Sequence, residues 1–231
     1  MAQQYLSNMV YNSRVHLLEM LEDRGYNVDQ YKNYTKPEII LMLREHSRNK
    51  METKSEVGPL DILVSKNSPH SEKVEKIYIK YRMDDKFKKT DSLIKQINEI
   101  YDTNLLSKTD TIIILNIARV ILKPGMKDKP DEEFSRQMFV TKGYYVQLFG
   151  LENFMFNVSR HDLVPKHTVM TKSEVDEMMA KYSITNKHNL PTIKAEDPQA
   201  KYIGLRPYQV CKIEVSNLTS GSTIKYRYCT L

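Results

Sequence analysis

The stretch TIIIL at residues 111–115 decides the fold of the first two-thirds of the chain. It is a continuous apolar run of strand length, which is typical of a strand in the middle of a sheet. Upstream, apolar side chains occupy the odd positions of residues 77–83, while Lys80 and Arg82 face the other way, which predicts a second strand. Between these strands, residues 90–101 carry an apolar stripe at helical spacing. Helices interleaved with central strands predict an α/β sandwich.

Two more helices are predicted near the N-terminus. Residues 5–23 repeat apolar side chains at roughly helical spacing, and Gly25 is a plausible stop. Thr35 is a good N-cap for the next helix, and Glu38, three residues on, completes a capping box. The polar residues 47–56 that follow are predicted to lie in solvent.

The remaining signals of this part are less regular. Residues 60–64 form a short apolar run after Gly58-Pro59 and predict a strand. Residues 123–133 contain two prolines, a glycine and many charges, which predicts a loop or an insertion. Helix and strand patterns resume over residues 134–158. We place a domain boundary near Phe156, giving domains at 1–156 and 157–231.

The second domain reads as a small α+β unit. Thr171 and Glu174 form a capping box, and the apolar stripe of the following helix extends to Tyr182. Asp197-Pro198 is a typical helix start. Residues 210–215 and 223–229 read as two strands joined by a turn at 216–221. The predicted class of the whole chain is therefore α+β, with an α/β N-terminal domain.

Composition excludes several classes of protein. The chain has 231 residues, of which 40% are hydrophobic and 28% charged, so a folded core is expected. No apolar run approaches the length of a membrane span, and no signal peptide is recognised. Cys211 and Cys229 are too few for a disulfide framework and read as buried thiols. The net charge of +6 is only mildly cationic.

Motif searches yield no site for chemistry. The seven glycines form no phosphate-binding loop, so no nucleotide cofactor is expected. His161 and His167 have no cysteine or glutamate at ligand spacing, so we expect structural or surface histidines rather than metal ligands. We predict no catalytic residue, no metal, no cofactor and no small-molecule substrate.

One arrangement resembles metal-dependent nucleases of the restriction-endonuclease type. Asp61 on a short strand is followed by a second strand and a helix, but those enzymes also need an acidic-x-Lys triplet on the second strand. Here the triplet that ends in Lys80 begins with Tyr78, and Glu75 is not two residues before a lysine. One carboxylate does not make a divalent-metal site. A residual nuclease nevertheless stays open as an alternative.

A basic segment over residues 76–89 includes interleaved aromatic side chains. One interpretation is an edge strand whose lysines prevent it from pairing with the strands of other chains. The other is weak electrostatic contact with a phosphate backbone, without base recognition. The DNA-facing candidates are Lys80, Arg82, Lys86, Lys88 and Lys89.

The last third of the chain resembles a known family in an ordered series of motifs. These are LVPKH at 163–167, VMTK at 169–172, LPTI at 190–193, DPQAKYIG at 197–204 and YR at 226–227. The series is similar to the C-terminal assembly domain of the fifth subunit shared by the eukaryotic nuclear RNA polymerases, a domain that also occurs in an archaeal counterpart. DRGY at 23–26 and LDILV at 60–64 are similar to the N-terminal jaw domain of the eukaryotic members, which the archaeal members lack.

The resemblance implies a non-catalytic subunit of a DNA-directed RNA polymerase. Its small domain would dock on the largest subunit and join the rest of the complex. Its jaw, a nuclease-like α/β fold without nuclease activity, would lie beside downstream duplex DNA. The contact residues that we carry over to this chain are Pro165, His167, Tyr202, Arg206, Gln209, Tyr226 and Arg227.

The chain departs from the family pattern near its last two strands. Pro207 and Tyr208 stand where the family has a basic residue and a glycine, and Glu214-Val215 stand where Arg-Pro is expected. Together with an extra loop and an excess of lysine over arginine, this favours a divergent lineage. Such a protein would be nuclear if cellular, or located in the virion or host cytoplasm if encoded by a large DNA virus. A free-standing DNA-binding module is the other alternative.

Overall fold

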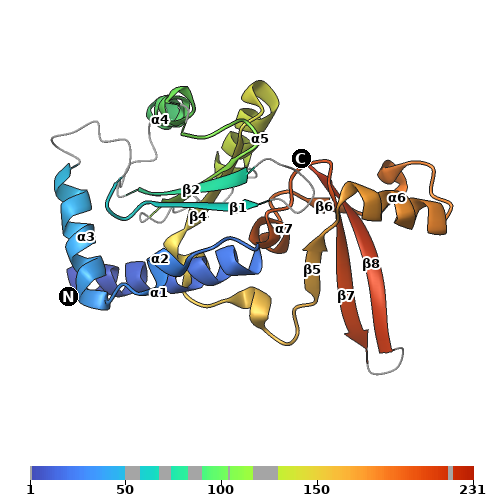
Figure 1. The fold of residues 1–231 in the computed structure, drawn as a ribbon, viewed down its shortest axis with the longest axis horizontal. Helices are drawn as coiled ribbons and strands as arrows, with labels where there is room; N and C mark the ends of the chain where they lie inside the picture. The colour runs from blue at the N-terminus through green and yellow to red at the C-terminus, as the bar shows by residue number, and fades with distance from the viewer. Residues whose placement is uncertain are drawn as a thin grey trace. The chain divides into compact units, whose positions relative to one another are not determined.

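The computed structural model describes residues 2–49, 58–67, 74–82, 90–103, 105–116, 130–217 and 221–231. The chain divides into two compact units, Met1–Phe156 and Asn157–Leu231 (Figure 1). Both contain helices and a sheet, which confirms the predicted α+β class. In the described ranges, no helix has the length and apolarity needed to cross a membrane.

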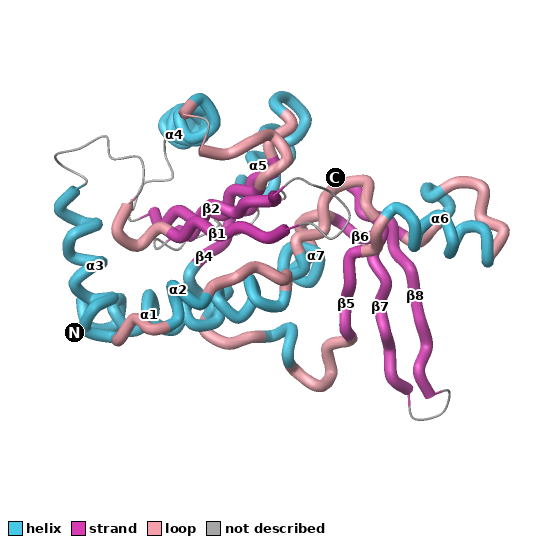
Figure 2. The backbone as a smooth tube through the Cα atoms, in the orientation of Figure 1, coloured by secondary structure: helices cyan, strands magenta, loops and turns pink. Residues whose placement is uncertain are grey.

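A four-stranded sheet organises the first unit (Figure 2). Its order is β1 (Ile62–Asn67), β2 (Val74–Arg82), β3 (Thr111–Asn116) and β4 (Tyr145–Gly150). β1 runs antiparallel to β2, whereas β2, β3 and β4 are parallel. Every residue of β3 is buried, so the TIIIL stretch is the central strand that its apolarity predicted.

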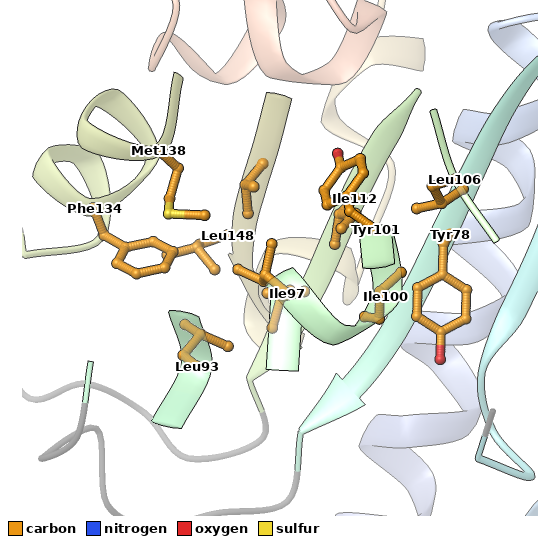
Figure 3. Close-up of a cluster of buried hydrophobic side chains, with 12 residues drawn as sticks. Tyr78, Leu93, Ile97, Ile100, Tyr101, Leu106, Ile112, Phe134, Met138 and Leu148 are labelled. Carbon is orange, nitrogen blue, oxygen red and sulfur yellow. The ribbon is translucent and has the colours of Figure 1, made fainter. Parts of the chain in front are cut away.

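Helices cover both faces of this sheet, as Figure 1 shows. α4 (Thr90–Asp102) and α5 (Pro130–Lys142) lie on one face, and α1 (Ala2–Asp23) lies on the other. Figure 3 shows the core under α4 and α5, whose labelled members are Tyr78, Leu93, Ile97, Ile100, Tyr101, Leu106, Ile112, Phe134, Met138 and Leu148. Burial of each large apolar side chain stabilises the fold by roughly 1.5–3 kcal/mol before entropy is counted.

The N-terminal helices follow the predicted caps, with longer bounds. Gly25 ends α1 with φ +84°, a left-handed conformation that glycine adopts without strain. A short α2 (Asp29–Lys32), which the sequence did not predict, leads to α3 (Lys36–Asn49). The Glu38 carboxylate accepts hydrogen bonds from the Thr35 N–H and hydroxyl at 2.6 and 2.7 Å. α3 extends to Asn49, so it includes the first residues of the polar stretch that begins at Ser47.

Two boundaries differ from the sequence prediction. β1 begins at Ile62, so Asp61 precedes the strand instead of lying on it. α5 begins at Pro130, inside the range expected to be a loop, because proline fits the first turn of a helix, where its missing N–H is not needed. Residues 123–129, the rest of that range, lie outside the described residues.

The second unit has its own four-stranded sheet, in the order β5 (Lys166–Val169), β7 (Val210–Asn217), β8 (Gly221–Thr230) and β6 (Thr192–Lys194). β7 and β8 form the predicted hairpin, but their pairing runs to Asn217 and Gly221, so the turn is shorter than expected. The sequence did not predict β5 and β6. At four and three residues they are too short for a pattern, and they form by pairing with the hairpin.

Two helices pack on opposite faces of this sheet. α6 (Lys172–Lys181) is capped by Thr171 and Glu174, and α7 (Pro198–Ile203) is capped by Asp197, as predicted. Tyr182, expected on the buried stripe of α6, is 52% exposed because α6 ends at Lys181. Short 3-10 turns complete the described chain at Leu151–Phe154, Val158–Arg160 and Lys187–Asn189.

Candidate functional site

The candidate nuclease carboxylate is buried and accepts three hydrogen bonds from the protein. Asp61 is 6% exposed. Its Oδ2 atom accepts hydrogen bonds from the Gly58 N–H at 2.7 Å and the Tyr78 hydroxyl at 2.6 Å, and its Oδ1 atom accepts one from the Tyr81 N–H at 3.1 Å. Burial, followed by the nearby Asp61 charge, raises the pKa of Tyr78 far above its ordinary value. Asp61 therefore acts as a structural anchor between the turn before β1 and β2.

The surroundings of Asp61 are those of a protein core. Arg14 of α1 is also buried and donates a hydrogen bond from Nη1 to the Leu60 carbonyl at 2.9 Å. Its guanidinium lies 5.8 and 5.6 Å from the ring centroids of Tyr31 and Tyr34. Such cation–π contacts are favourable when the cation is shielded from water. Within the ranges that the structure describes, no group of three or more His, Cys, Asp or Glu side chains could hold a metal ion.

The DNA-facing candidates are only partly placed by the structure. Lys80 and Arg82 lie near the carboxyl end of β2, paired with Ile114 and Asn116 of β3, and both are half-buried. The two-residue repeat puts them on the face of the sheet that carries Tyr78, which α4 and α5 cover. Lys86, Lys88 and Lys89 lie outside the described residues.

Several of the candidate partner contacts in the second unit are held by local hydrogen bonds. His167 Nδ1 donates to the Pro165 carbonyl at 2.7 Å. The Arg206 N–H donates to Gln209 Oε1 at 2.8 Å. The Tyr202 hydroxyl, on α7, accepts from Asn157 Nδ2 at 3.0 Å. These hydrogen bonds hold the side chains of His167, Gln209 and Tyr202 in place within the unit.

The strand register divides the candidates between the two faces of the sheet. His167 pairs with Ile213, and Arg227 pairs with Cys211, so both lie on the face that packs against α7. Tyr226 lies on the other face, where its ring centroid is 5.9 Å from that of Tyr182. Arg227 also donates from Nη1 to the Thr192 carbonyl of β6 at 2.8 Å. His167 and Arg227 therefore lie on the face of the sheet opposite to Tyr226.

Tyr208 is a site feature that the sequence only hinted at. Its backbone is left-handed, with φ +72°, and its side chain is 53% exposed. The Tyr208 N–H donates to the Cys229 carbonyl at 2.9 Å, while the Cys229 N–H donates to the Gln209 carbonyl at 2.8 Å. This is the pattern of a β-bulge whose first residue is normally glycine. The replacement of the family's glycine by Tyr208 was the one sign in the sequence of an unusual backbone conformation at this position.

Glu214, which stands where the family has an arginine, has lysine neighbours on the surface of the sheet. Glu214 Oε1 lies 2.7 Å from Lys212 Nζ on the same strand, and Lys166 is the cross-strand neighbour of Glu214. The hydrogen bond from Lys212, and then its charge, lower the pKa of Glu214. The acidic residue that replaces the expected arginine is thus paired with neighbouring lysines.

Comparisons with known proteins identify the family. Residues 156–229 match the model of "RNA polymerase Rpb5, C-terminal domain". The chain is 30% identical over 213 residues to "DNA-directed RNA polymerases I, II, and III subunit RPABC1" of Caenorhabditis elegans, a match that covers 91% of this chain and 90% of the relative. The chain belongs to the Rpb5 family of RNA polymerase subunits. As an Rpb5-family protein it is a structural subunit of a transcribing enzyme, in agreement with the sequence prediction.

Two further relatives show how the family varies. "DNA-directed RNA polymerases IV and V subunit 5B" of Arabidopsis thaliana is 28% identical over 221 residues, which cover 94% of this chain and 88% of the relative. "DNA-directed RNA polymerase subunit Rpo5" of Archaeoglobus fulgidus is 44% identical over 72 residues, which cover 31% of this chain but 93% of the relative. These relatives are cellular proteins and give no support to a viral origin of the Rpb5-family chain.

Proposed function

We propose that the chain docks on the largest subunit of a DNA-directed RNA polymerase through its second unit, Asn157–Leu231. The match to the archaeal subunit carries this proposal. It spans 72 residues, about the size of the second unit, yet covers 93% of that relative. A domain that suffices as a polymerase subunit by itself is the natural candidate for the attachment to the complex. The candidate contacts are Pro165, His167, Tyr202, Arg206, Gln209, Tyr226 and Arg227.

The size of the second unit also favours a partner. A folded domain of about this length buries only about 60% of its unfolded surface, so its stability alone is marginal. Its apolar side chains divide into two small clusters, one under α7 and one under α6. A partner that binds only the folded unit would stabilise it by mass action.

The first unit would then act as a jaw beside downstream duplex DNA during transcription. Of the DNA-facing candidates, Lys80 and Arg82 are described, and both are half-buried. Contact would be weak and directed to the backbone, because few counterions would be released. The relatives from Caenorhabditis elegans and Arabidopsis thaliana are RNA polymerase subunits of eukaryotes, which supports a nuclear location.

A capture experiment tests the docking. Tagged full chain, tagged residues 157–231 and tagged residues 1–156 would each be expressed in the source organism, and the captured chains identified by mass. We expect the full chain and residues 157–231 to retain the largest polymerase subunit, and residues 1–156 to lose it. Retention by residues 1–156 alone would contradict the proposal.

A further inference from the structure

The outer edge of β8 is open along most of its length. β6 pairs with β8 only at Tyr228, Cys229 and Thr230, whereas β7 pairs with β8 from Tyr228 to Gly221. Figures 1 and 2 show β7 and β8 running on well beyond the short strand β6. Residues 222–227 of β8 are therefore paired on one side only among the described strands. At about 3.3 Å per residue, this open edge is roughly 20 Å long.

The hydrogen-bonding groups on this edge can be assigned from the register. The Cys229 N–H bonds toward β7, to the Gln209 carbonyl, and the Tyr228 N–H bonds outward, to the Pro191 carbonyl. The pairing of β8 with β7 continues from Tyr228 to Gly221 without a change of register. The backbone N–H and C=O groups of the odd-numbered residues of β8 therefore face β7, and those of the even-numbered residues face outward. The N–H and C=O groups of Ile224 and Tyr226 thus point away from β7, at the open edge.

The side chains beside this edge have a regular pattern. Ile224 and Tyr226 lie on the face that α6 covers further along, and Ile224 is 46% exposed. Lys225 and Arg227 lie on the opposite face, and both are exposed. β6 and β8 are described throughout, and their charged residues are Lys194, Lys225 and Arg227, all basic. No ion pair joins Lys225 or Arg227 to a carboxylate in the described parts of the chain.

We infer that β8 binds an extended segment of the docking partner as an added strand, with alternating apolar and acidic side chains. Its backbone would bond to Ile224 and Tyr226, as edge-strand recognition requires. Its apolar side chains would face Ile224 and Tyr226, and its carboxylates would face Lys225 and Arg227. This inference rests on the proposed docking and assigns it to one edge of one strand.

The simpler alternative is that the two cations only keep the edge from pairing with other chains. Charged residues on an edge strand often have this role. The two interpretations differ in what happens on assembly, because an edge that is merely protected stays open in the complex. An added strand instead protects the outward amides of Ile224 and Tyr226.

Hydrogen exchange on the full chain, free and in the purified polymerase, tests the inference. Mass spectrometry with electron-transfer fragmentation resolves single amides in the C-terminal peptide. We expect the Ile224 and Tyr226 amides to exchange at least about tenfold more slowly in the complex. The Thr223 and Lys225 amides, which bond to β7, are the internal control and are slow in both states.

A pair of variants at one position provides a second measurement. Ile224→Pro removes an outward N–H, and an edge strand tolerates proline where its N–H would face solvent. Ile224→Ala shortens the same side chain but keeps the N–H. Each variant would compete with wild type for incorporation into the polymerase. We expect Ile224→Pro to be incorporated about tenfold less than wild type, because the loss of one hydrogen bond weakens binding by about tenfold. Ile224→Ala should reduce incorporation much less.

Charge reversal completes the design. Lys225→Glu and Arg227→Glu should each reduce incorporation, while Lys172→Glu, at an exposed position on α6, should not. A complex that forms normally while the Ile224 and Tyr226 amides stay fast would overturn the added strand but leave the docking intact. A chain that enters no polymerase complex would overturn both.

Discussion

The sharpest prediction on the fold concerns Asp61→Asn. The wild-type carboxylate accepts three hydrogen bonds, two at Oδ2 and one at Oδ1. An asparagine side chain has the same shape but a single acceptor oxygen. If that oxygen takes the Oδ2 position, the amide NH₂ meets the Tyr81 N–H, and two donors face each other. The reverse orientation places the NH₂ against the Gly58 N–H, although the Tyr78 hydroxyl could rotate to accept.

Either orientation leaves a buried backbone N–H without an acceptor. The unpaired N–H lowers the free energy of unfolding by about 1–3 kcal/mol. The remaining hydrogen bonds also weaken, because their acceptor no longer carries a charge, so we expect Asp61→Asn to destabilise the first unit by roughly 2–4 kcal/mol in total. The assay is urea unfolding of the full chain, followed by far-ultraviolet circular dichroism and fitted as two transitions because the chain has two units. Only the transition of the first unit should move.

The control is Asp29→Asn, the same change at a side chain that is 80% exposed. It should alter the free energy of unfolding by less than about 0.5 kcal/mol. If Asp61→Asn unfolds at the same urea concentration as this control, the carboxylate does not anchor β1 to β2, and the structural explanation of its burial is wrong. Metal-dependent DNA cleavage that disappears in Asp61→Asn would instead restore the nuclease alternative.

Three further predictions concern other parts of the chain. Tyr208→Gly should stabilise the second unit by roughly 0.5–1 kcal/mol in urea unfolding, because glycine adopts φ +72° without strain; a lower stability would mean that the tyrosine ring contributes more than its backbone costs. Burial raises the pKa of Cys211 to about 11 and of Cys229 to about 12, from 9.0. As the pH rises above 9, these thiols ionise in the unfolded chain before they ionise in the folded one, so the free energy of unfolding falls until the pH reaches 11–12. In urea unfolding measured at a series of pH values, Cys211→Ala should make this fall less steep; the same pH dependence as wild type would refute the prediction. The isolated full chain should bind duplex DNA weakly, and Lys80→Ala with Arg82→Ala should lower the salt dependence of log K by no more than about two units; a larger drop would indicate a dedicated DNA-binding site.

Local signals in the sequence predicted much of the fold. The apolarity of TIIIL was sufficient to place β3 in the centre of a sheet, because a strand buried on both faces needs no polar side. The caps at Thr171 and Asp197 formed as expected, since each depends on residues within one helical turn. The ordered motifs of the last third indicate the polymerase-subunit family from the sequence alone, and the family model matches the same region.

Local sequence patterns could not predict the contacts between residues far apart in the chain. Asp61 meets Tyr78 and Tyr81, 17 and 20 residues away, and no local pattern indicates that its carboxylate is already satisfied. The division of the partner candidates between two faces follows from the β7–β8 register, which is a tertiary property. β5 and β6 exist only as additions to the hairpin, so their short sequences carried little signal of their own.

Size fractionation of a native extract tests the central claim most directly. The chains that co-migrate with the protein would be identified by mass, and RNA synthesis would be assayed across the same fractions. We expect the protein in a single polymerase-sized peak, in equal amount with the largest subunit and together with the synthetic activity. A protein that migrates as a lone chain of 27.1 kDa, separate from that activity, would contradict the account.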